Sequence, residues 1–94
     1  MRVELSPFVE QDLQEIADYI ALHNPTRALS FVEELERAIQ HIAENPLAYR
    51  LRPDAERGMR VAIYGRYLIL FRVVGDVVFV GRVVNGACDL LKLR

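Results

Sequence analysis

The spacing of apolar residues changes once along the chain. In the first half, apolar side chains recur every three or four residues, which is the period of a helix that buries one face. From residue 59 onward, runs rich in Val, Ile, Tyr and Phe replace that spacing, as is typical of strands. Residues 2–5 alternate polar and apolar side chains, which suits a short strand. The pattern predicts a strand, then helices, then a sheet.

Three pairs that end in proline set the limits of the predicted helices. A Ser-Pro pair at residues 6–7 puts a capping hydroxyl before a proline in the first turn. An N–H at that position would have no partner within the helix, so the N–H that proline lacks costs nothing there. An Asn-Pro pair at 24–25 repeats the start signal, and another at 45–46 ends the pattern. Because so few residues separate the two helices, we expect an antiparallel helical hairpin.

The predicted sheet has three strands in the second half of the chain. Runs at residues 59–64, 67–74 and 77–84 are separated by Gly-Arg and Gly-Asp breaks, which are of the kind that closes a β-hairpin. The predicted fold class is α+β: an N-terminal strand, a two-helix antiparallel hairpin, and a three-stranded antiparallel β-meander. Ninety-four residues are too few for two cores, so we expect a single domain over residues 1–94.

Two-residue hairpin loops would pair Tyr64 with Tyr67 and Val74 with Val77, and this register divides the strands into two faces. The first face is almost wholly apolar, and we expect it to pack on the helices. It collects Met59, Val61, Ile63, Leu68, Leu70, Val74, Phe79 and Val83. Arg72 also falls on this face, so either its side chain extends out to solvent or the register is shifted by one residue.

The second face mixes arginine and tyrosine with apolar side chains. It collects Arg60, Ala62, Tyr64, Tyr67, Ile69, Phe71, Val78, Val80 and Arg82. Two helices can cover only one face of such a sheet, so we interpret this second face as a binding surface. The alternative is that the C-terminal tail or a loop folds over it.

Charge is divided unevenly along the sequence. Residues 1–47 hold three basic and nine acidic residues, whereas residues 48–94 hold nine basic and four acidic ones. Eleven of the twelve basic residues are arginine, whose planar fork suits carboxylate or phosphate groups. The basic half is either a working surface or simply the neighbour of the acidic half in the fold.

Several classes of protein are excluded or disfavoured by composition. No run approaches the roughly 18 apolar residues of a membrane span, and early charges argue against a signal peptide, so a cytoplasmic protein is expected. Cys88 is the only cysteine, which excludes an internal disulfide and a multi-cysteine metal site. His23 and His41 lack further ligands nearby, so neither a metal nor another cofactor is expected.

Short segments in a fixed order resemble a known superfamily. They are Ser-Pro at 6–7, Asp-Leu at 12–13, Ile16, Tyr-Ile at 19–20, Asn-Pro at 24–25, Ala28, Phe31, Asn-Pro at 45–46, Gly-Arg-Tyr-Leu-Ile at 65–69 and Arg-Val-Val-Asn-Gly-Ala-Cys-Asp-Leu at 82–90. With the predicted order of elements, this set resembles the ParE/RelE superfamily of small bacterial toxins, and it is most similar to the ParE branch.

That resemblance implies the toxin of a type II toxin–antitoxin system. ParE-like toxins are described as stalling the DNA gyrase–DNA complex by binding, without being hydrolases. A small ParD-like antitoxin neutralises them in a hetero-oligomer. We expect the antitoxin to bury an amphipathic helix or an added strand, at the groove of the helical hairpin and at the sheet edge. A non-toxic relative that only binds antitoxin is an alternative.

The RelE branch, which cuts messenger RNA on the ribosome, is the other alternative. It uses an arginine in the third strand, an arginine after the last strand, and often a terminal Tyr or His. The corresponding positions here hold Leu68, Cys88, and Leu93 or Arg94. We therefore assign no catalytic residue and expect a binding protein.

The candidate target contacts lie on the second face and in the turn after the last strand. They are Arg60, Tyr67, Arg82, Asn85, Cys88 and Asp89. In the family this turn usually reads His-Gly-Ala-Arg-Asp, whereas this chain has Asn-Gly-Ala-Cys-Asp at 85–89. The missing arginine implies a weakened toxin, a different target, or transfer of its role to Arg82 or Arg60.

Overall fold

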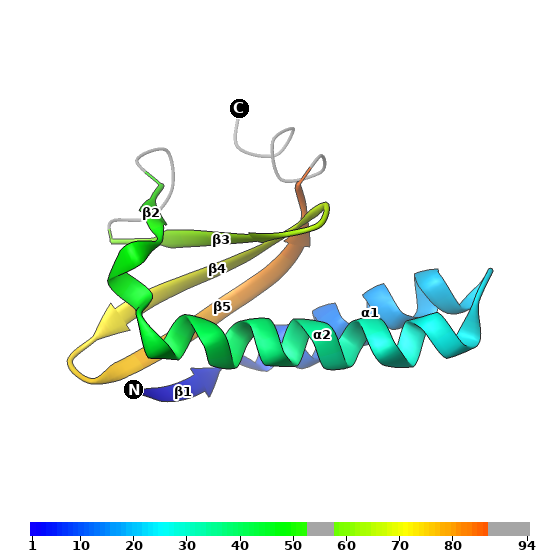
Figure 1. The fold of residues 1–94 in the computed structure, drawn as a ribbon, viewed down its shortest axis with the longest axis horizontal. Coiled ribbons are helices and arrows are strands. Elements are labelled where there is room, and N and C mark those ends of the chain that lie inside the picture. The colour runs from blue at the N-terminus through cyan, green and yellow to red at the C-terminus, as the bar shows by residue number, and fades with distance from the viewer. Residues whose placement is uncertain (53–57, 87–94) are drawn as a thin grey trace.

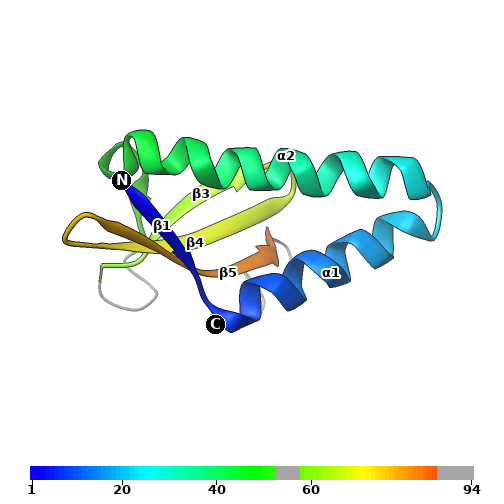
Figure 2. The same ribbon diagram turned by 90° about the horizontal axis from the view of Figure 1, so that it is seen from below.

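The computed structural model describes residues 1–52 and 58–86 and has an α+β fold, as predicted. Two helices lie across one face of a five-stranded sheet (Figures 1 and 2). The elements are β1 (Arg2–Leu5), α1 (Pro7–Ala21), α2 (Pro25–Glu44), the 3₁₀ helix η1 (Pro46–Ala48), β2 (Arg50–Leu51), β3 (Arg60–Tyr64), β4 (Tyr67–Val74) and β5 (Val77–Asn85). The short strand β2 was not predicted.

Both helices begin at the predicted capping residues. The Ser6 hydroxyl accepts a hydrogen bond from the Phe8 N–H at 3.2 Å, and the Asn24 side chain accepts one from the Arg27 N–H at 3.0 Å. Proline follows each cap in the first turn. These caps satisfy amides that the start of a helix otherwise leaves unpaired.

The sheet has the order β1-β5-β4-β3-β2, with β1 parallel to β5. The predicted hairpin pairs Tyr64–Tyr67 and Val74–Val77 are both present. Gly65 has a φ of 61°, a left-handed conformation that glycine adopts without a Cβ clash, and this permits the tight turn between β3 and β4.

A β-bulge in β5 changes the predicted register. Phe71 pairs with Val80, as expected, but Leu70 pairs with Arg82, so Gly81 has no partner on β4. Uninterrupted pairing from Val74–Val77 predicts Arg82 opposite Ile69, and this part of the predicted register was wrong because Ile69 pairs with Val83. The extra residue moves each side chain that follows it to the opposite face of the sheet. A prediction that assumes strict alternation along the strand does not include such a residue.

The assignment of the two faces was also wrong, because the helices pack on the face predicted to be free. The buried cluster comprises Val9, Ile16, Leu35, Ile39 and Ile42 of the helices with Ala62, Tyr67, Ile69, Phe71, Val78, Val80 and Val83 of the sheet. Ile69 is fully buried, whereas Ile63, predicted to be in the core, is 74% exposed. Both faces are rich in apolar residues, so alternation separates them without showing which one is covered.

Candidate functional site

The face of β3, β4 and β5 turned away from the helices is called here the outer sheet face. Its apolar side chains include Val61, Ile63, Leu68, Leu70, Val74 and Phe79, none of which is fully buried. A hollow of about 710 Å³ on this face reaches from β4 across β5 to the start of α1. Surface of this size and apolar character is typical of a site that binds another macromolecule.

The hollow combines apolar and cationic side chains. Leu70 and Phe79 line it with Phe8 of α1, and Arg72 and Arg82 also contribute. Phe79 remains 39% exposed. Sequence reasoning missed Phe8, Leu70, Arg72 and Phe79 as binding residues because it assigned their face to the core or left them out. Arg72 was the available signal, since a core face seldom carries an arginine.

Arg82 reaches the outer sheet face because of the bulge. Its Nε donates to Oδ2 of Asp12 at 2.7 Å, and its Nη2 donates to Oδ1 at 2.9 Å. The Val83 N–H donates to the same carboxylate at 3.0 Å. Asp12 is buried, and its carboxylate raises the pKa of Arg82. This two-point contact fixes the orientation of a guanidinium that stays half exposed.

The aromatic ring of Phe8 lies beside the same guanidinium. The Cζ atom of Arg82 is 5.8 Å from the ring centroid of Phe8, within the range of a cation–π contact. The Ser6 hydroxyl donates to the Gly81 carbonyl at 2.6 Å. The start of α1 is thus joined to β5 at the bulge itself, and this positions Arg82.

The other predicted contacts lie elsewhere. Tyr67 is buried against Phe31, at 5.5 Å between ring centroids, and burial raises its pKa. Arg60 is half-buried on the helix side of the sheet and donates to the Tyr49 carbonyl at 2.7 Å. Asn85 is half-buried at the end of β5. The structure therefore contradicts the prediction that Arg60 and Tyr67 lie on an uncovered face.

Two of the predicted contacts, Cys88 and Asp89, lie outside the described residues. Within residues 1–52 and 58–86, no group of three His, Cys, Asp or Glu side chains is arranged to hold a metal ion. None of the helices in that part of the chain is both long and apolar enough to cross a membrane.

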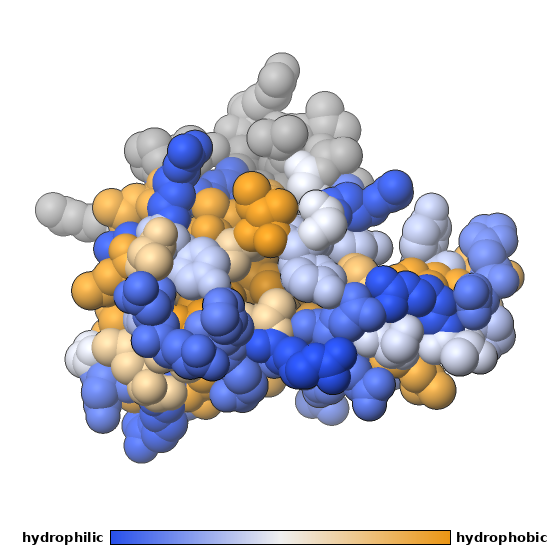
Figure 3. Space-filling model, in the orientation of Figure 1, coloured by the Kyte–Doolittle hydropathy of each residue, from blue (hydrophilic) through white to orange (hydrophobic). Residues whose placement is uncertain are grey.

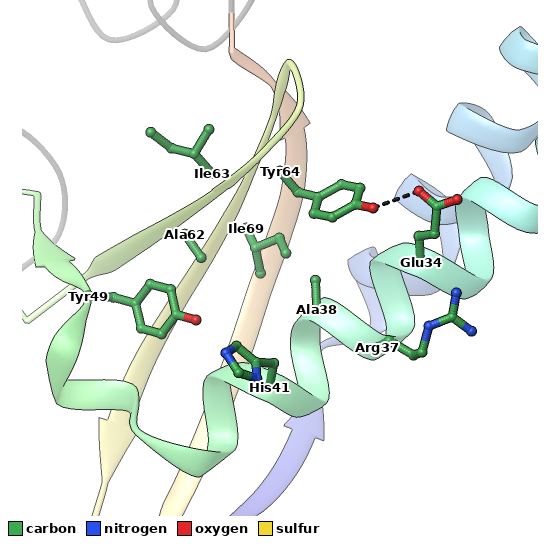
Figure 4. Close-up of a pocket in the computed structure, with 9 residues that line it drawn as sticks. All are labelled: Glu34, Arg37, Ala38, His41, Tyr49, Ala62, Ile63, Tyr64 and Ile69. Atoms are coloured by element: carbon green, nitrogen blue, oxygen red, sulfur yellow. Dashed lines mark hydrogen bonds between the residues drawn. The ribbon is translucent and has the colours of Figure 1, made fainter.

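A second polar cluster lies between α2 and β3. Arg27 donates to both carboxylate oxygens of Glu34, and the Tyr64 hydroxyl donates to Oε1 at 2.6 Å (Figure 4). The bonds from Arg27 and then Tyr64 lower the pKa of Glu34 to about 2, and Glu34 in turn raises the pKa of Tyr64. The cluster fixes Tyr64 against α2 and uses both oxygens of the Glu34 carboxylate.

Polar and apolar surface meet beside this cluster. The space-filling view shows hydrophilic side chains along α2 and hydrophobic surface above them, over the sheet (Figure 3). Hydrophobic surface is therefore exposed on the side of the molecule that carries α2.

A family model and a solved structure both match this chain. The sequence matches the family described as "ParE toxin of type II toxin-antitoxin system, parDE" over residues 3–90. A solved structure described as "Chromosomal ParDE TA system from P. aeruginosa" superposes with a TM-score of 0.78 at 23% identity. The match covers 90% of this chain and 95% of that chain, and at this identity the likeness concerns the fold. No curated protein is significantly similar in sequence.

Proposed function

Because this chain belongs to the ParE toxin family of type II toxin–antitoxin systems, we propose that it inhibits DNA gyrase by binding and is neutralised by a ParD-like antitoxin. One observation supports this most strongly: an apolar sheet face that none of the residues in 1–52 and 58–86 covers, and that holds a fixed, half-exposed arginine, Arg82. Such a face suits a macromolecular partner better than a small substrate. Because DNA gyrase is the proposed target, the proposed site of action is the cytoplasm.

The antitoxin is the proposed occupant of the outer sheet face in the neutralised state. Leu70 and Phe79 offer apolar contact, and Arg72 and Arg82 lie beside them. An amphipathic helix with acidic residues beside its apolar stripe matches that combination. The antitoxin and the target then compete for one surface, which accounts for neutralisation.

Arg82 and Asn85 are the proposed target contacts among the described residues. Both lie in the last part of β5, and Cys88 and Asp89 follow shortly after it in the sequence. Arg60 and Tyr67 are proposed to support this region from the helix side, since Tyr67 is buried and pairs with Asn85. A guanidinium is well suited to phosphates of a protein–DNA complex.

We propose binding without catalysis. The described side chains that line the hollow include no histidine or tyrosine, and Glu4 is their one carboxylate. Cutting RNA requires a general acid or base beside the scissile phosphate. This composition favours a gyrase-binding toxin over a ribosome-dependent nuclease.

Induced expression tests the proposal. We expect growth arrest when the chain is expressed alone, and normal growth when the small reading frame beside its gene is expressed with it. Lost supercoiling in arrested cells supports gyrase as the target. Cut messenger RNA in a purified translation system would instead support the nuclease alternative, and absence of arrest would support the non-toxic relative.

A further inference from the structure

A cleft of about 500 Å³ lies between α2 and β3 (Figure 4). It is distinct from the hollow on the outer sheet face and does not include Arg82. Ala62 and Ile69 form its apolar floor, and Tyr49 and Tyr64 stand at its two ends. Arg37 and His41 line it from α2. Its shape is that of a short groove along the edge of the sheet.

Among residues 1–52 and 58–86, no strand pairs with the edge of β3 beyond Val61 beside this cleft. β2 pairs with β3 only at Arg60 and Val61. The Arg52 N–H donates to the Met59 carbonyl at 2.7 Å, so Met59 directs its main-chain oxygen away from β4. Alternate residues of an antiparallel strand face the same neighbour. Ile63 therefore directs its N–H and C=O toward the open edge, where no described strand pairs with it.

Among the described side chains that line the cleft, the charge without a bonded carboxylate is the positive charge of Arg37. Glu34 already accepts bonds from Arg27 and Tyr64. Arg37 is exposed and has no ion pair or side-chain hydrogen bond with any described residue. His41 is exposed as well, and its Nδ1 atom lies 3.6 Å from Oε1 of Glu44. A partner that enters the cleft gains most from a carboxylate near Arg37.

We propose that this cleft binds a short extended segment of the antitoxin, which adds as a strand along β3. Its main chain pairs with Ile63, an apolar side chain lies on Ala62 and Ile69, and an acidic side chain lies opposite Arg37. Unpaired main-chain groups in a groove favour a strand over a helix. The inference rests on the proposed function, because the partner is the antitoxin.

The cleft is continuous with the outer sheet face. Ala62 and Ile69 point toward α2, whereas Ile63 lies on the side of β3 turned away from it (Figure 4). One antitoxin chain can therefore cover the outer sheet face with a helix and pass around β3 into the cleft as a strand.

Amide hydrogen exchange measured by NMR tests the strand. The probe is the purified product of the reading frame beside this gene, mixed with the full chain. We expect the Ile63 amide to exchange at least about tenfold more slowly in the complex. The Gly75 amide, in the turn at the other end of β4, serves as the control and should not change.

Two matched charge reversals test the acidic contact. Arg37→Glu should raise the Kd for the antitoxin about tenfold more than Arg66→Glu, which makes the same charge change in the exposed turn between β3 and β4. If the wild-type complex forms while Ile63 stays unprotected, or if the two variants bind alike, the cleft proposal is overturned and the antitoxin proposal stands. Absence of any complex contradicts both.

Discussion

Asp12 and Arg82, on α1 and β5, form a two-point ion pair that joins the first helix to the last strand. The carboxylate is buried, and the Val83 N–H supplies a third donor. Three donors offset the desolvation of a buried charge. The pair therefore has two consequences: it stabilises the contact between α1 and the sheet, and it holds Arg82 in place on the outer sheet face.

Removing Asp12 should be more damaging than removing Arg82. Asp12→Ala leaves the buried Val83 amide and the guanidinium without their acceptor, and we expect a loss of about 2–3 kcal/mol. Arg82→Ala keeps the Val83 bond but removes two of the three donors to the buried carboxylate, so it should cost a smaller but still measurable amount, about 1–2 kcal/mol. Urea denaturation of both single variants and the double variant measures the coupling. Asp18→Ala, an exposed change on α1, is the control, and strict additivity of the pair would contradict this account.

The reversal of the sheet faces can be tested with two isoleucines on adjacent strands. Ile69→Ala empties fully buried space and should lower the free energy of unfolding by about 2–5 kcal/mol. Ile63→Ala, on the outer sheet face, should change it by less than about 0.5 kcal/mol. Thermal or urea unfolding measures both. Equal losses, or a larger loss at Ile63, would show that the faces are assigned incorrectly.

Glu34 should contribute to stability at neutral pH and lose that contribution in acid. Its pKa is about 2 in the folded chain, chiefly because Arg27 donates to it, against an ordinary value of 4.5. A lowered pKa stabilises the fold above pH 4.5, and the contribution disappears as the pH falls toward 2. The Tm of Glu34→Gln should therefore fall less over this range than the wild-type Tm.

Glu33→Gln is the matched control for that experiment. Glu33 is an exposed carboxylate on the same helix, and no described residue bonds to it. Its Tm profile should follow the wild type. If Glu34→Gln and Glu33→Gln have the same acid profile, the network of Arg27, Glu34 and Tyr64 does not stabilise the fold.

The apolar part of the outer sheet face should be required for antitoxin binding. Phe79→Asp places a charge in the hollow, so we expect at least about a tenfold weaker Kd without unfolding. Leu29→Asp makes the same change at an exposed site on α2. Calorimetric titration of both variants with antitoxin distinguishes the two surfaces. A larger effect at Leu29 would place the antitoxin on the helical hairpin.

Local signals in the sequence predicted the backbone well. Ser6 and Asn24 cap their helices because a side-chain oxygen can accept from an unpaired amide of the first turn, and the proline that follows favours the start of a helix. Two-residue breaks fixed the hairpin register, because a tight turn leaves little choice of pairing. These features depend on neighbouring residues alone, which is why they can be predicted without knowledge of the rest of the fold.

The candidate site was harder to predict because it depends on distant contacts. Which sheet face is covered depends on where α1 and α2 pack, and two apolar faces leave that open. Arg72 indicated the exposed face but could equally be explained as a side chain that extends to solvent. The bulge at Gly81 and the partner of Arg82 follow from packing between α1 and β5, which no local pattern in β5 contains.

Supercoiling by purified DNA gyrase tests the central claim most directly. Plasmid supercoiling should be inhibited by the wild-type chain, restored by adding antitoxin, and inhibited about tenfold less strongly by folded Arg82→Ala. A cooperative unfolding transition of Arg82→Ala in urea would show that the variant is folded. Undiminished supercoiling in a large excess of the wild-type chain would contradict the account.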